Sequence, residues 1–231
     1  MRPLLAVFLL LCVPFADARS PEDLVKAART QIGVTTSYDP AYRKLAFPGG
    51  DVPPDRGVCT DVVIRAYRKL GIDLQALVNR DMRAAWSAYP KHWGLKSTDT
   101  NIDHRRVPNL EVFFRRHGTA LPLSERAGDY QPGDIVTWLV PPHLPHIGIV
   151  ADERSANGAP LVIHNIGAGT QVEDILFAFR MVGHYRYLPA TSAPSLREKK
   201  CRCRTRQTAA ESSAMLRWRH KRTDHIAGNG Y

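Results

Sequence analysis

This chain of 231 residues has few long apolar runs, few cysteines and few acidic residues near one end, and each scarcity excludes certain classes of protein. Beyond residue 20 no apolar run is long enough to span a bilayer, which excludes a polytopic membrane protein. No internal repeat is visible. With 44% hydrophobic and 23% charged residues, the composition is ordinary for a folded globular chain and excludes collagen-like or wholly disordered classes. The length favours one domain or two.

Cysteine is the second scarcity, with only four in the chain: Cys12, Cys59, Cys201 and Cys203. Three of them lie near the ends, so the body holds Cys59 alone. Small exported domains usually use cysteines in disulfide pairs. A leftover cysteine is either a small buried apolar residue or a reactive thiol, and the count alone leaves both interpretations open.

Acidic residues are scarce mainly at one end. The formal net charge is +10, yet residues 197–231 alone hold ten Lys or Arg against three Asp or Glu, while residues 19–196 carry only about +3. The body is therefore only mildly basic, and we expect no nucleic-acid partner. The segment 191–231 has few aliphatic residues and is predicted to be a disordered basic tail. Binding of this tail to an anionic polymer or to lipid head groups is the alternative.

The first 18 residues have the pattern of a secretory signal. Arg2 precedes an apolar stretch, Leu4–Phe15, and Ala16-Asp17-Ala18 has the small-x-small form of a cleavage site. We therefore expect export to the periplasm or beyond the cell, maturation near Arg19, and no integral membrane segment after cleavage. The folded domain is predicted over residues 19–190, and the oligomeric state stays open.

The body changes periodicity midway. Helices are predicted from Ser20 to Gly33, from Cys59 to Leu70, after the cap Asp73, and from Pro108 to His117. Short β-rich runs separated by turn residues follow at 134–140, 146–151, 160–164 and 182–188. Helices followed by a meander of strands indicate an α+β fold with an antiparallel sheet.

The position of Cys59 favours a reactive thiol. It follows a loop rich in Gly and Pro and opens a predicted helix, where free N–H groups and the positive end of the helix dipole stabilise a thiolate. We therefore expect the pKa of Cys59 to be lowered from the usual value of about 8.5. Asp61 in the first turn opposes this shift slightly, unless it caps the helix.

A nucleophilic cysteine needs a base, and two of the seven histidines in the body lie at the edges of β runs. These are His146 and His164. If the hairpin between them turns around Ser155, facing residues have numbers that sum to 310, as 146 and 164 do. The Cβ atoms of His146 and His164 would then lie about 5 Å apart. His164 would then orient His146 toward the thiol. A tighter turn at Asn157-Gly158 would break that register.

These pieces occur in a specific order. Gly57-Val58-Cys59-Thr60-Asp61 leads a helix, Pro132-Gly133-Asp134 opens a strand, and His146-Ile147-Gly148-Ile149 and Val162-Ile163-His164 form the next two. The order resembles the NlpC-type, papain-like cell-wall cysteine peptidases over roughly residues 33–188. Together with Tyr38-Asp39-Pro40 and Asp103-His104-Arg105-Arg106, it is closer still to the exported bacterial family numbered 1287 among domains of unknown function.

The resemblance implies a papain-like fold in which helices carrying the cysteine pack on an antiparallel sheet carrying the histidines. It implies cleavage of amide or isopeptide bonds in peptidoglycan stem peptides, with Cys59 as nucleophile, His146 as base and His164 as orienting residue. Tyr38 is expected to line the oxyanion site, with Tyr42 as its competitor. The family pattern has Asp-Cys-Ser-Gly where this chain has Val58-Cys59-Thr60-Asp61, and Asp61 is expected to be one of the residues that contact the substrate.

Arg105 and Arg106 are candidates for clamping a substrate carboxylate, since a guanidinium matches a carboxylate bidentately. A salt-bridged loop is the alternative.

We predict no metal or other cofactor. The rival chemistry is a zinc site formed by His143, His146, His164 and Cys59. The rival functions are an amidase or acyl transferase acting on another substrate and a non-catalytic wall-binding module on the same fold.

Overall fold

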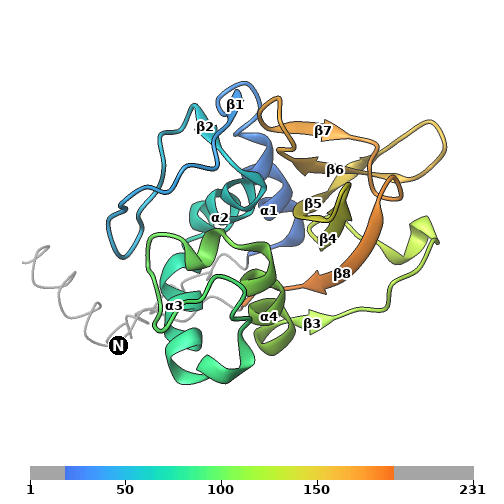
Figure 1. The fold of residues 1–231 in the computed structure, drawn as a ribbon. Helices are drawn as coiled ribbons and strands as arrows, with labels where there is room; N and C mark the ends of the chain where they lie inside the picture. The colour runs from blue at the N-terminus through green and yellow to red at the C-terminus, as the bar shows by residue number, and fades with distance from the viewer. Residues whose placement is uncertain (1–18, 190–231) are drawn as a thin grey trace, which may run out of the picture. The chain divides into compact units, whose positions relative to one another are not determined.

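The computed structural model describes residues 19–189, in which helices pack against an antiparallel sheet (Figure 1). The predicted signal at 1–18 and the basic tail at 191–231 lie outside the described residues. No helix in the described part of the chain combines the length and the apolar character needed to cross a membrane.

Two of the helices begin directly after their predicted capping residues. α1 (Pro21–Arg29) starts after Ser20, which forms a reciprocal capping box with Asp23. α2 spans Cys59–Lys69, α3 (Leu74–Ala84) starts after the cap Asp73, and α4 spans Val107–His117. A separate 3₁₀ turn, Trp86–Ala88, follows α3.

The sheet has the order β3-β8-β4-β5-β6-β7, with every neighbouring pair antiparallel. Its strands are β3 (Thr119–Ala120), β4 (Ile135–Val140), β5 (Leu144–Arg154), β6 (Pro160–His164), β7 (Gln171–Glu173) and β8 (Arg180–Arg186). The four predicted β runs are the long strands, and the α+β class is confirmed. β3, β7 and the separate parallel pair β1 (Ser37–Tyr38) and β2 (Arg56–Gly57) were not predicted, because two or three residues show no alternation.

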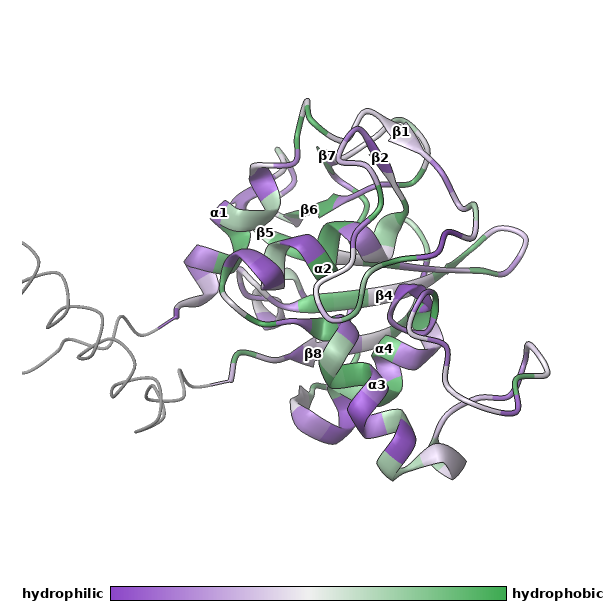
Figure 2. Ribbon diagram, turned by 90° about the vertical axis from the view of Figure 1, so that its left-hand side faces the viewer, coloured by the Kyte–Doolittle hydropathy of each residue, from purple (hydrophilic) through white to green (hydrophobic). Residues whose placement is uncertain are grey.

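Alternation along the strands divides the core in two. Ile147 and Ile149 of β5 and Ile163 of β6 face the helices, where α2 packs centrally. Val150 and Val162 face the opposite side of the sheet, together with Trp138. Figure 2 shows apolar residues where the helices meet the sheet and polar residues on their outer turns.

The pairing of β5 with β6 differs from the predicted register. Ile149 pairs with Ile163 and Val150 with Val162, so facing residues sum to 312 rather than 310. The hairpin closes between Ser155 and Ala159, with Gly158 at φ 80°, and the ladder shifts beyond Val150. His146 and His164 are therefore diagonal neighbours on one face rather than a directly facing pair.

Candidate active site

Cys59 is the first residue of α2, and the loop before it is held firmly. Val58 is the N-cap, and its backbone N–H donates to Oδ2 of Asp61 at 2.7 Å. Asn165, just after β6, donates to the carbonyl of Gly57 at 3.1 Å. The first bond holds the start of α2, and the second ties it to the end of β6, which places the thiol at that end of the sheet.

The thiol lies beside the strand that carries His146. The backbone N–H of Val150 donates to Asp134 beside β4, and N–H groups along a strand alternate between its two edges. The N–H of Ile147 therefore points toward the β6 side, where the last described pair is Ile149 with Ile163. Instead of a strand partner, this N–H has the Cys59 thiol as its acceptor. The residue directly before Ile147 is His146, so the cysteine and the base come from adjacent backbone.

The predicted thiolate is not what the structure supports. Burial raises the pKa of the Cys59 thiol to about 12, with a further contribution from Asp61, despite hydrogen bonds from the backbone of Ile147, Thr60 and Cys59 itself. Cys59 is only 4% exposed. The helix start does supply N–H donors, as the sequence predicts, but loss of water outweighs them. The resting thiol is neutral.

A relay of contacts runs from His146 to the edge of the sheet. Nε2 of His146 lies 2.9 Å from Nδ1 of His164, and the two rings meet edge to face. Nε2 of His164 lies 2.8 Å from Oε2 of Glu173 on β7, although the two do not form a regular hydrogen bond. The predicted contact between the histidines is present, and Glu173 is a neighbour that sequence reasoning missed.

Gly148 makes the diagonal contact sterically feasible. The register places Gly148 opposite His164, two residues beyond His146 on the same face. A Cβ at position 148 would lie 2.5 Å from Cγ1 of Val162 and 3.3 Å from Cβ of His164. The missing side chain therefore leaves the space through which His164 leans toward His146. This is a physical reason for the His-x-Gly spacing in the sequence.

His146 is held as a neutral base. Burial, and secondarily the neighbouring His164, lower the pKa of His146 to about 3. The ring of Trp138 lies alongside at 5.8 Å between centroids, and its indole N–H is anchored on the carbonyl of Leu176. Within residues 19–189 no hydrogen bond joins the thiol to His146. Such contacts commonly tighten only when substrate binds.

Asp61 and Arg105 contact each other rather than a substrate. Nε and Nη2 of Arg105 each donate to one Asp61 oxygen at 2.9 Å, and both side chains are almost fully buried. The remaining contacts of Arg105 are to the carbonyls of Ala41 and Asp39. The substrate roles predicted for Asp61 and Arg105 are corrected accordingly. The ion pair holds the start of α2 against the loop before it, and the N–H donors of Arg105 already have partners within the protein.

The other two predicted substrate-contacting residues, Tyr38 and Arg106, differ in how accessible they are. Tyr38 is 41% exposed, and burial of its hydroxyl near the Cys59 thiol raises the pKa of Tyr38 to about 12. Tyr42, its competitor, instead bonds to Asp99 at 3.0 Å. Arg106 is partly buried, with its guanidinium over the ring of Trp93 and 3.5 Å from Asp103. Tyr38 therefore lies near the thiol, whereas Arg106 is the N-cap of α4.

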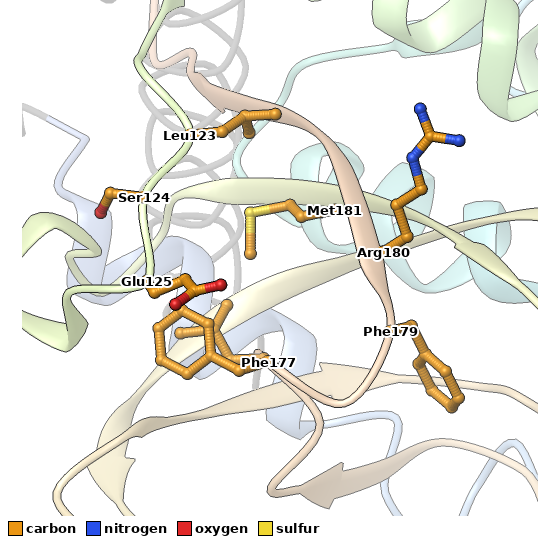
Figure 3. Close-up of a pocket in the computed structure, with 8 residues that line it drawn as sticks. Leu123, Ser124, Glu125, Phe177, Phe179, Arg180 and Met181 are labelled. Carbon is orange, nitrogen blue, oxygen red and sulfur yellow. The ribbon is translucent and has the colours of Figure 1, made fainter.

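The rival zinc arrangement has no geometric counterpart in the described part of the chain, where no three His, Cys, Asp or Glu side chains gather as metal ligands. A separate hollow of about 670 Å³ lies beyond β8. Figure 3 shows Leu123, Met181 and Phe177 around it, with the guanidinium of Arg180 pointing away. None of the predicted site residues lines this hollow.

Comparison with known proteins identifies related sequences. The family described as "Domain of unknown function (DUF1287)" matches residues 25–187. The chain is 58% identical over 164 residues to the "Uncharacterized protein YijF" of Escherichia coli (strain K12), which covers 71% of this chain and 80% of that protein.

Among solved structures the chain is similar to two from Trichomonas vaginalis. NlpC2 is 18% identical with a TM-score of 0.41, and NlpC1 is 17% identical with a TM-score of 0.40. They cover 76% and 75% of this chain, which spans about half the length of each.

Proposed function

From the premise that the chain belongs to the DUF1287 family, we propose that it is an exported cysteine hydrolase cleaving amide bonds in peptidoglycan stem peptides. One observation carries the proposal: the Cys59 thiol lies against the backbone N–H of Ile147, the residue next to His146, and the ring of His146 contacts His164 beside Glu173. The resemblance of the sequence motifs to cell-wall peptidases and the predicted export signal support the substrate and a periplasmic or secreted location.

The reaction begins from neutral groups. As Sγ of Cys59 attacks the amide carbon, its proton moves to Nδ1 of His146, which makes no hydrogen bond among the described residues. The protonated His146 then gives that proton to the leaving nitrogen, and the carbon–nitrogen bond breaks to leave a thioester. Water next attacks the thioester while His146 takes a proton from it. As the carbon–sulfur bond breaks, His146 returns this proton to Sγ, which releases the acid product and regenerates the free thiol.

Stabilisation of the oxyanion falls to groups around the start of α2. The backbone N–H groups of Cys59 and Thr60 lie at the open helix end, close to Sγ. The hydroxyl of Tyr38 is near the thiol and protonated at neutral pH, since its pKa is raised to about 12. Preorganised donors of this kind are each worth about 10²–10³-fold in rate.

The experiment is digestion of purified peptidoglycan by the full chain, read by mass spectrometry of released muropeptides. We expect products from the wild type, and from a His143→Ala control at an exposed histidine outside the relay. Cys59→Ala is expected to release none. Equal release by Cys59→Ala would overturn the proposal, and the masses of the products would identify the bond.

A second candidate, a non-catalytic wall-binding module, is favoured by one observation: Cys59 is almost inaccessible and its thiol is neutral. This candidate predicts that the wild type and Cys59→Ala sediment equally with insoluble peptidoglycan while neither releases muropeptides. A thioester adduct on Cys59, trapped by acid quenching and detected by mass, would exclude it.

A further inference from the structure

Glu173 is placed to control the two histidines from the edge of the sheet. β7 pairs Glu173 with Val162 and Gln171 with His164, so the carboxylate reaches the ring of His164 diagonally. The side chain of His164 is fully buried, whereas that of Glu173 is 40% exposed. Nε2 of His164 has no regular hydrogen-bond partner in the described region, which leaves this carboxylate as its near neighbour at 2.8 Å.

The position of each proton follows from this contact. An ionised carboxylate has only acceptors, and a ring nitrogen with a lone pair at 2.8 Å would repel it, so Nε2 of His164 carries hydrogen. A neutral His164 then has its lone pair on Nδ1. The 2.9 Å contact needs one proton, which Nε2 of His146 supplies. Because burial keeps His146 neutral, its own lone pair is on Nδ1.

We propose that Glu173 is a positioning residue that selects the tautomers of both histidines, so that Nδ1 of His146 is left unprotonated to receive the thiol proton. The catalytic meaning of this role rests on the proposed function. The tautomers themselves are a property of the resting protein. In histidines generally, the hydrogen-bond partner of one ring nitrogen determines whether the other nitrogen carries a proton.

Nuclear magnetic resonance of the full chain labelled with ¹⁵N-histidine tests the assignment directly. In the wild type near neutral pH we expect both His146 and His164 as single Nε2–H tautomers. Glu173→Gln offers an amide that can donate as well as accept, so we expect both rings to become tautomer mixtures. Asp174→Asn removes the same charge from the adjacent exposed residue and is expected to leave both spectra unchanged.

Activity gives a second, separable measurement. Loss of the outer partner of a metal-bound histidine typically costs about 10–100-fold, and by analogy we expect Glu173→Gln to lower kcat by about that factor with KM nearly unchanged. A wild-type spectrum with hydrogen on Nδ1 of His146, or tautomers unaltered by Glu173→Gln, would overturn the role of Glu173. Tautomers that shift as expected in a protein that hydrolyses nothing would support the positioning role and refute the proposed function.

Discussion

Two histidine–carboxylate contacts occur in the same sheet, and they are built differently. His164 lies 2.8 Å from Glu173, and His184 lies 2.9 Å from Asp134. Both nitrogens of His184 have partners, because Nδ1 also lies 3.3 Å from the carbonyl of Pro122. Asp134 is fully buried and accepts two further bonds from the guanidinium of Arg186. In this second network both ring nitrogens of His184 and both carboxylate oxygens of Asp134 have partners.

The difference separates a stabilising network from one that can move a proton. Burial would raise the pKa of Asp134, but hydrogen bonds from His184, Arg186 and the backbone of Gln131 outweigh it and lower that pKa. The His164 network instead ends at a half-exposed carboxylate and, at its other end, at Nδ1 of His146. A buried histidine is therefore informative only when the partners of both its nitrogens are known.

The largest effect that tests this comparison is expected for His146→Ala. Loss of a general base costs about 10²–10⁴-fold in kcat/KM, measured on the folded fraction. Both histidines are buried, so both variants should lower Tm, but His184→Ala should keep nearly full activity in its folded fraction. Muropeptide release and thermal melts measured on both variants provide the check. Equal loss of activity in the two would remove the distinction.

Asp134→Ala is expected to give the largest loss of stability. It removes the carboxylate that both His184 and Arg186 contact, and a buried polar group left without its partner typically costs about 1–3 kcal/mol. Urea unfolding measures the loss, with Asp174→Asn as the exposed control.

The same carboxylate predicts the sign of an acid effect. Because the folded pKa of Asp134 is lowered, its contribution is complete above the ordinary carboxyl pKa of about 3.9 and disappears as pH falls through the folded value. The difference in stability between the wild type and Asp134→Ala should therefore shrink below about pH 4. A difference that widens in acid would contradict this assignment.

Two glycines in crowded positions allow loss of activity to be separated from loss of stability, with smaller expected effects. A Cβ on Gly148 would lie 2.5 Å from Val162, and one on Gly183 would lie 2.5 Å from Oγ1 of Thr137. Overpacking at such sites costs about 1–3 kcal/mol, so Gly148→Ala and Gly183→Ala should lose similar stability. Only Gly148→Ala displaces His164 and should reduce kcat. Matched loss of kcat in both variants would mean that the reduction reflects general destabilisation.

The smallest expected effect is that of pH on the rate. The pKa of His146 is near 3 and that of Cys59 near 12, so the neutral imidazole and neutral thiol persist between them. We expect kcat/KM to be nearly flat from about pH 5 to about pH 9, with loss only as His146 becomes protonated in stronger acid. A bell-shaped profile centred near neutrality would indicate a preformed thiolate–imidazolium pair instead.

Sequence pattern anticipated much of the site because local rules govern it. The N-cap and helix period located Cys59 at the start of α2, and strand alternation placed His146 and His164 on one face. The predicted register of β5 with β6 was wrong, because facing residue numbers sum to 312 rather than 310. The turn and the shift beyond Val150 depend on packing around Ser155–Ala159. Glu173 was missed because β7 is only three residues long and pairs at the sheet edge.

The sequence by itself determined the α+β order of elements and which residue types were available for chemistry. Helix caps, 3.6-residue periodicity and strand alternation act over a few residues, so they can be read along the chain. Only the tertiary structure decided the protonation and the partners of those residues. Burial makes the Cys59 thiol neutral where its helix position favoured a thiolate, and Arg105 pairs with Asp61 instead of a substrate. Loss of water and long-range contacts set these properties, and neither is encoded in local spacing.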